Sequence, residues 1–465
     1  MILFPTPSAD PDEPLNWSKA RKTLNYTIVS LFVLFTFVEL DIGFTAWGQM
    51  ETELGFTVNN LNAGVAVNYG GLAIGCFVLL PLARKYGRRP IYILASVFQL
   101  ASCVWNAEVY TFGNYIGANM VSGLGGAISE VIVQMTVADL FFVHHHATMN
   151  GLFVLFESIG AFLGPVASGY IVQSQGWRWT WWWCVIFFGI ILACVIFLFE
   201  ESKYVPIFGA QNVAPAAQVT AVEHPESSRS PTVKHPSDDK KGIIESTVRY
   251  DTPCPEFKLK TYLQRIAFLT PSSESIWSHA WYPIITLFTF PAVSYTAITY
   301  GSTLCWFAVM TSLQATYMLL PPYNFSSIGI GLMNVAPFIG GLLGFPFSGY
   351  LSDKSIIWLS KRNGGIYEPE MRLWLLLPMI ILGPGSILMF GLGLAYVCHE
   401  NPRFGQADIS PSLKGAHWSV LVVGYGIYGF VFSCAGGLSL SYLMDCYQDV
   451  SNLFIHIDNL VYPKF

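Results

Sequence analysis

The chain has 465 residues, of which 53% are hydrophobic and only 11% are charged, and its mean hydropathy is +0.48. Soluble globular proteins carry about 25% charged residues, so this composition excludes an ordinary soluble domain. The net charge of −5 decides little, because in a membrane protein the positions of the charges matter more than their sum.

Long apolar stretches follow one another along the chain. About 20 apolar residues cross a hydrocarbon core about 30 Å thick, and a helix satisfies its own backbone hydrogen bonds there. We therefore predict an all-α polytopic membrane protein. The spans are expected near 27–49, 62–83, 91–108, 113–139, 149–172, 180–200, 284–313, 325–351, 373–397 and 416–444.

The order of these segments predicts two helical bundles joined by a long loop. The expected parts are an N-tail (1–26), a six-helix bundle (27–200), a loop (201–280), a second bundle with about four spans (281–450) and an atypical tail (451–465). The first ten residues do not resemble a signal peptide. The start of the loop, rich in Pro, Ser, Glu and Lys, predicts a tether that cannot bury a core, although its Ser and Thr could also be regulatory phosphorylation sites. Residues 257–269 predict an amphipathic helix at the membrane surface.

Lys and Arg gather in alternate connections between spans. They are Lys19, Arg21 and Lys22 before the first span, Arg84, Lys85, Arg88 and Arg89 after the second, and Lys354, Lys361 and Arg362 after the eighth. The connections after spans 1, 3 and 7 carry neither residue. Positive residues favour the cytoplasmic side, so we predict a cytoplasmic N-terminus, with the plasma membrane as the expected location.

Two short motifs predict moving parts. The connection after the second span, Leu80–Pro90, combines Gly87 with the cations Arg84, Lys85, Arg88 and Arg89 and predicts a gating latch. The alternative is positive-inside charge alone. The fifth span carries Gly160, Gly164, Pro165 and Gly169. Small residues allow close helix contact and proline permits a kink, which predicts a flexible point in this span.

Several segments together resemble the fungal drug:proton antiporter branch of the major facilitator superfamily. They are Asp10–Ser18, Tyr86–Pro90, Gly164-Pro165, Gly176–Trp179 and Gly349–Lys354. The resemblance covers about residues 10–450. It implies a twelve-helix fold of two six-helix bundles that works by alternating access.

The chain departs from the pattern of that family at defined positions. Leu80 and Arg84 replace a glycine and an aspartate of the first latch, whereas the second copy keeps Asp353 and Lys354 as gating residues. Asn119 stands where the family often has an arginine implicated in proton coupling, four residues before Gly123. Two further helices usually follow the tenth span, which predicts that the second bundle is cut short.

Ionisable side chains inside a span are costly, so each is a candidate functional residue. Glu39 and Asp41 lie two apart in the first span and should point to opposite sides of the helix. Glu130 and Gln134 should share one face of the fourth span. Glu157 precedes the glycine–proline motif, and Asn68 and Asn334 are further candidates. Hydrogen bonds between helices are the alternative role for these groups.

An acid-lined cavity favours a cationic or drug-like substrate. A carboxylate in a low-dielectric environment favours its protonated form, as a proton carrier requires. We therefore predict a secondary-active transporter of small organic molecules, with proton coupling through Glu130, Glu157 or Glu39 and with the direction of transport open. The alternative is a truncated, non-transporting paralogue that acts as a sensor or scaffold.

The remaining expectations concern partners and cofactors. The sequence contains no nucleophile triad, phosphate loop or metal-ligand spacing, so we expect no enzyme activity, no cofactor and no metal. His144, His145 and His146 are expected in the turn after the fourth span, and three consecutive histidines do not share a face. The expected partners are the lipid bilayer, a small-molecule substrate and, if coupling exists, protons. We expect a monomer that binds no nucleic acid.

Overall fold

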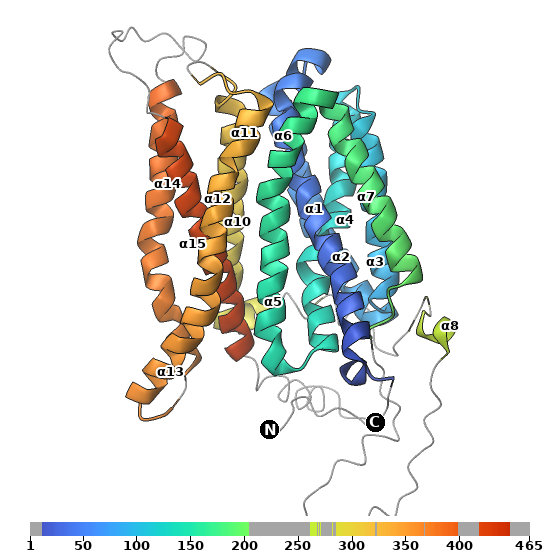
Figure 1. Ribbon diagram of the computed structural model, residues 1–465, viewed down its shortest axis with the longest axis vertical. Coiled ribbons are helices and arrows are strands. Elements are labelled where there is room, and N and C mark those ends of the chain that lie inside the picture. The colour runs from blue at the N-terminus through green and yellow to red at the C-terminus, as the bar shows by residue number, and fades with distance from the viewer. Residues whose placement is uncertain are drawn as a thin grey trace, which may run out of the picture.

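The long apolar segments form helices that lie side by side along one axis in the computed structural model (Figure 1). The structure describes residues 12–203, 285–398 and 418–446 apart from 321, 322 and 367, together with 261–266, 268, 270 and 281. Within these residues, nine helices are long and apolar enough to cross a membrane. This arrangement confirms the predicted all-α polytopic fold class.

The first half of the chain forms one group of helices, at the right of Figure 1. A short 3-10 turn, η1 (Pro14–Asn16), precedes α1 (Lys19–Leu54), α2 (Val58–Tyr86), α3 (Arg89–Ala107), α4 (Phe112–Leu140), α5 (Val143–Ser158), the π-helical turn η2 (Ile159–Leu163), α6 (Gly164–Gln175) and α7 (Trp177–Phe197). Side-chain hydroxyls of Ser18, Thr57 and Thr111 accept from backbone N–H groups and cap α1, α2 and α4.

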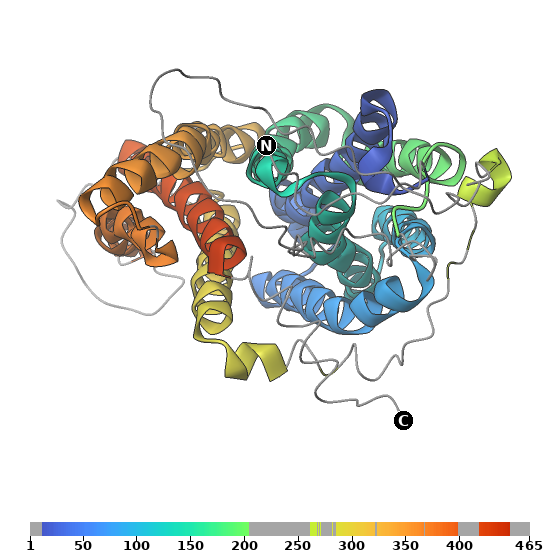
Figure 2. The same cartoon turned by 90° about the horizontal axis from the view of Figure 1, so that it is seen from below.

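The second half forms the group at the left. It contains α10 (Pro291–Tyr317), α11 (Ser327–Met333), α12 (Val335–Pro346), η4 (Phe347–Leu351), α13 (Ser352–Arg362), η5 (Pro369–Leu376), α14 (Leu377–Cys398) and α15 (Trp418–Cys446). Figure 2 shows the two groups side by side, with α8 (Tyr262–Arg265) at the edge of the first group.

The two ends of the molecule differ in charge. We call the end that carries Arg84–Arg89, Lys354 and Lys361–Arg362 the basic end; α1 begins there and α13 ends there. The opposite end holds the start of α11 and the end of α6 (Figure 1). The predicted cytoplasmic side corresponds to the basic end.

The structure corrects several predicted boundaries. The predicted seventh span, 284–313, is interrupted near its start: residues 285–289 are helical, Phe290 is extended, and α10 begins at Pro291 with proline in its first turn. At 27 residues α10 is long enough to span, but it is not one of the nine helices that are also apolar enough, since hydroxyl and amide side chains such as Thr311 and Gln314 lie along it. The predicted loop 352–372 is largely helical, because α13 continues the eighth span to Arg362.

Two other local predictions were wrong. The described part of the expected amphipathic helix 257–269 is only the single turn α8, since the carbonyls of Arg265 and Ile266 accept from the first bundle instead of continuing a helix. Residues 257–260 lie outside the described part. His144–His146 lie in the first turns of α5 and not in a loop, while their side chains lie outside the described set.

Candidate functional site

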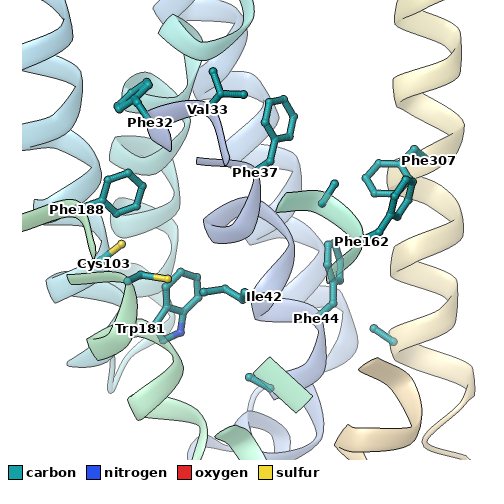
Figure 3. Close-up of a cluster of buried hydrophobic side chains, with 14 of the residues drawn as sticks. Phe32, Val33, Phe37, Ile42, Phe44, Cys103, Phe162, Trp181, Phe188 and Phe307 are labelled. Carbon is teal, nitrogen blue, oxygen red and sulfur yellow. The ribbon is translucent and has the colours of Figure 1, made fainter. Parts of the chain in front are cut away.

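One stripe of α1 faces the second bundle. Phe37, Asp41, Phe44 and Gly48 recur at the spacing of one helix face. Figure 3 shows Phe37 and Phe44 on the side toward Phe307, whereas Ile42 lies on the side of Trp181. A Cβ placed on Gly48 would meet the Leu319 side chain at 3.2 Å. Asp41 therefore lies on the surface where the two bundles meet.

Asp41 is only 2% exposed, and its Oδ1 has no hydrogen-bond partner. The Tyr425 phenol of α15 lies near enough to Asp41 for an electrostatic interaction. The Tyr425 hydroxyl lies 3.0 Å from Thr311 Oγ1 and donates to Asn334 Oδ1 at 3.3 Å. We call Asp41, Thr311, Asn334 and Tyr425 the interface polar cluster. It brings a carboxylate and neutral oxygens together among buried side chains, where a cation would compensate the carboxylate charge.

An aromatic layer adjoins the interface polar cluster toward the basic end. The ring of Phe162 packs edge-on against Phe307 at 5.5 Å and against Phe432 at 6.2 Å, so side chains of both bundles meet here (Figure 3). These rings come from η2, α10 and α15. The layer contains no charged atom and separates the polar groups on its two sides.

Glu157 lies on the other side of this aromatic layer. It is 1% exposed, and the Tyr300 hydroxyl of α10 donates to its Oε1 at 3.4 Å across the interface. Thr311 and Tyr300 stand 11 residues apart on α10, about 16 Å along its axis. Among the described side chains, the interface thus carries one buried carboxylate on each side of this aromatic layer.

Glu39 points away from the interface, into the first bundle, as its separation from Asp41 predicts: two residues turn a helix by about 200°. Ser102 of α3 donates to Glu39 Oε1 at 2.6 Å, and the Gln99 amide donates to Oε2. Gln99 in turn accepts from the Gly126 N–H at 3.0 Å. Glu39 is 2% exposed and is held by neutral donors from α3.

The amide candidates extend this network between α2 and α4. Asn68 donates to Ser122 Oγ at 3.0 Å and to Asn119 Oδ1 at 3.5 Å, while its own Oδ1 is unpartnered. Asn119 donates to the Tyr115 carbonyl at 2.9 Å. Gln134 has a buried, unpartnered Oε1 on α4. The Glu130 side chain lies outside the described part of the chain.

The connection between α2 and α3 is anchored within the first bundle. Arg88 pairs with Asp139 of α4 at 2.9 Å. The Glu201 carboxylate accepts from the backbone N–H groups of Arg88 at 2.9 Å and Arg89 at 3.1 Å, and so it caps the start of α3. Lys203 donates to the Lys85 carbonyl at 2.8 Å. We call Tyr86–Arg89 the gating turn.

Other predicted gating residues make fewer polar contacts. The Asp353 carboxylate lies 3.5 Å from Arg372, and Lys354 lies over the Tyr350 ring at 4.4 Å. Both side chains are exposed at the basic end. Arg84 is half-buried in the last turn of α2. The second copy of the latch is thus a surface feature, whereas the gating turn is built into its bundle.

The kink motif contacts both bundles. The backbone faces of Gly160 and Gly164 lie against α1, where a Cβ on Gly164 would meet Val38 Cα at 3.2 Å. Gly169, farther along, lies against α11, where its Cβ would meet the Ser327 carbonyl oxygen at 2.6 Å. The π-helical turn η2, just before Gly164-Pro165, interrupts the regular α-helix between these two contacts.

Several contributors were not predicted from the sequence. Tyr425, Thr311 and Tyr300 resemble ordinary span residues, and only the fold brings them to Asp41 and Glu157. Asp139 and Glu201 stand at helix ends, where a charge is common. A carboxylate that ends a span on the same side of the membrane as the basic turn is a signal that could have identified these two residues.

Known proteins are similar in sequence to this chain. The profile of the Major Facilitator Superfamily matches residues 27–453. An uncharacterized MFS-type transporter, C1271.10c, of Schizosaccharomyces pombe is 31% identical over 96% of this chain and 77% of its own length. Protein HOL1 of Saccharomyces cerevisiae is 28% identical over 97% of this chain and 80% of its own. The MFS transporter cpaT of Aspergillus oryzae is 27% identical over 82% and 69%.

Proposed function

The chain belongs to the major facilitator superfamily and is a membrane transporter, and we propose that it moves small organic cations or drug-like molecules by alternating access. We further propose that it belongs to the drug:proton antiporter-like branch and that it lies in the plasma membrane with its basic end in the cytoplasm. The observation that carries the substrate class is Asp41, a buried carboxylate at the interface whose Oδ1 lacks a hydrogen-bond partner.

A buried carboxylate is stable when it is protonated or when a cation compensates its charge. The interface polar cluster supplies neutral oxygens around Asp41, and the neighbouring aromatic rings can contribute cation–π contacts. Asn334 and Gln134 are proposed contributors to the substrate path, together with Asn68 in the adjoining network. The substrate would exchange between the two faces past the aromatic layer of Phe162.

Proton coupling is proposed through Glu39, Glu157 or Glu130. Glu39 receives hydrogen bonds from neutral donors, so a proton can neutralise it without breaking an ion pair. Glu157 contacts the second bundle through Tyr300, so its protonation would act directly on the interface.

Transport by the purified chain in proteoliposomes tests the proposal. Radiolabelled tetraphenylphosphonium, a lipophilic cation, should accumulate in wild-type vesicles, and Asp41→Asn should reduce the initial rate at least about tenfold. Asp41→Glu, which keeps the charge, is the matched control. Equal uptake by wild type and Asp41→Asn would remove the proposed role of Asp41. Flux that ignores an imposed pH gradient would exclude coupling, and unchanged coupling in Glu130→Gln would exclude Glu130 as the proton site.

A further inference from the structure

A piece of the loop between the bundles is fastened to the gating turn. The Thr270 N–H donates to the Tyr86 carbonyl at 2.9 Å, and the Thr270 hydroxyl donates to the same oxygen at 3.3 Å. The Glu201 N–H donates to the Arg265 carbonyl at 3.3 Å, and Arg89 donates to the Ile266 carbonyl. We call α8, Ile266 and Thr270 the strap.

Thr270 occupies the tightest point of this contact. Gly87 has φ +110°, a conformation that favours glycine, and a Cβ there would lie within 2.6 Å of both Glu201 Oε2 and Thr270 Oγ1. The Thr270 hydroxyl and the Glu201 carboxylate therefore both pack against Gly87, at the place that a side chain would occupy. Lys203 joins the two sides, because its ammonium donates to the carbonyls of Lys85 and Thr270.

Thr270 is followed by Pro271, and a hydroxyl residue before proline is the minimal acceptor sequence of proline-directed protein kinases. We propose that Thr270 is a phosphorylation site whose modification releases the strap from the gating turn. In the reaction, the Thr270 Oγ–phosphorus bond forms as the bond from the γ-phosphorus of ATP to ADP breaks. The hydroxyl proton passes to the base of the kinase.

A phosphorylated Thr270 side chain is incompatible with the docked position of the strap. The ester oxygen has no proton to donate to the Tyr86 carbonyl, so that hydrogen bond is lost. The Tyr86 carbonyl and the Glu201 carboxylate beside the Thr270 hydroxyl are both acceptors, and a phosphate next to a carboxylate is repelled. Two of the three N–H groups of the Lys203 ammonium already donate to the Lys85 and Thr270 carbonyls.

Docking and phosphorylation compete for Thr270. A kinase must bind the acceptor in an accessible conformation, whereas the docked hydroxyl is half-buried and hydrogen-bonded. The rate of phosphorylation therefore reports the undocked fraction, and phosphate then holds the strap undocked. This link gives the cell a covalent means of freeing the gating turn.

The first test weakens docking and measures phosphorylation. Purified full-length chain in nanodiscs is incubated with a mitogen-activated-type kinase and ATP, and phosphate at each site is followed by mass spectrometry. Gly87→Ala should speed modification of Thr270 about fivefold, the effect of losing one ordinary hydrogen bond. Gly70→Ala, where a Cβ has open space, is the matched control. The Thr-Pro site at Thr252 is an internal control that should not change.

The second test needs no glycine variant and therefore stands if Gly87→Ala fails to fold. Hydrogen exchange of the Thr270 amide and of the gating turn should quicken about tenfold in phosphorylated wild type. Unphosphorylated Thr270→Val keeps the amide donor and loses only the hydroxyl hydrogen bond, so its exchange should quicken less than that of the phosphorylated chain, by about fivefold. The proposal would be overturned if the kinase modified Thr252 but not Thr270, or if Thr270 were phosphorylated at equal rates in Gly87→Ala and Gly70→Ala. Unchanged hydrogen exchange of the gating turn after phosphorylation would also overturn it.

Discussion

Adding a methyl group to Gly169 or Gly331 should open the contact between the bundles at the end opposite the basic end. These glycines form a reciprocal contact between α6 and α11. A Cβ on Gly169 would lie 2.6 Å from the Ser327 carbonyl oxygen and 3.1 Å from Ile328 Cα. A Cβ on Gly331 would lie 2.6 Å from the Pro165 carbonyl oxygen. The obstructing atoms are backbone atoms, so a rotamer change cannot relieve the clash.

The size of the effect depends on the conformational state in which the added methyl group clashes. Overpacking costs about 1–3 kcal/mol, and here the whole penalty falls on the state in which the two helices touch. Since 1.36 kcal/mol is a factor of ten at 25 °C, each alanine should shift the closed-to-open ratio about 5- to 150-fold. The two substitutions act on one contact, so their effects should not add.

Spin labels on either side of this contact measure the shift. Ser174 on α6 and Leu332 on α11 are exposed positions for labelling in a background without reactive cysteines. Double electron–electron resonance should show a longer distance in Gly169→Ala and in Gly331→Ala. Gly301→Ala is the matched control, because a Cβ there meets nothing within 4 Å.

Two results would refute this reasoning. An unchanged distance distribution in both variants would mean that the contact does not separate during the cycle. A shift of the same size in Gly301→Ala would mean that the effect is the helix propensity of alanine and not the clash, since alanine favours the helix over glycine by about 1 kcal/mol.

Three further predictions concern carboxylates and their partners. Glu39→Gln keeps an acceptor for Ser102 but cannot bind a proton reversibly, so we expect transport that no longer responds to a pH gradient, measured by proteoliposome flux. Tyr300→Phe removes only a 3.4 Å hydrogen bond to Glu157 and should slow flux less than threefold, whereas Glu157→Gln should have the larger effect. Glu201→Ala removes the cap of α3 and should lower stability by about 1–2 kcal/mol, measured as a reduced Tm in detergent, and an unchanged Tm would contradict that role.

The pattern of apolar residues was sufficient to predict most helices of this fold. It failed where a helix and an apolar segment do not begin or end at the same residue. Apolar length predicted α2 to α4 closely. It missed the extension of α13 to Arg362, because that segment is amphipathic and reads as a loop after an apolar span. It also missed the break in the helix at Phe290, because the apolar run passes through that position.

Some residues of the candidate site could be predicted from the sequence and others could not. A charge inside an apolar segment is visible in the sequence, so Glu39, Asp41 and Glu157 were found there. Their partners were not, because Tyr425 and Tyr300 are common residue types that become significant only when distant helices meet. The opposite facing of Glu39 and Asp41 could be predicted, since it depends on helix geometry alone.

The replacement of the usual arginine by Asn119 changes what can balance the buried carboxylates. Among the described residues, Arg89 is the buried cation, and it lies at the basic end, where it donates to the carbonyls of Ile196 and Ile266. Asn119 itself is engaged with the Tyr115 carbonyl and Asn68. An unpaired buried carboxylate carries a desolvation penalty of several kcal/mol, so Asp41 must be neutralised by a proton or by a ligand. A cationic substrate bound at Asp41 would remove this penalty, while proton coupling is proposed for the other buried carboxylates, Glu39, Glu157 or Glu130.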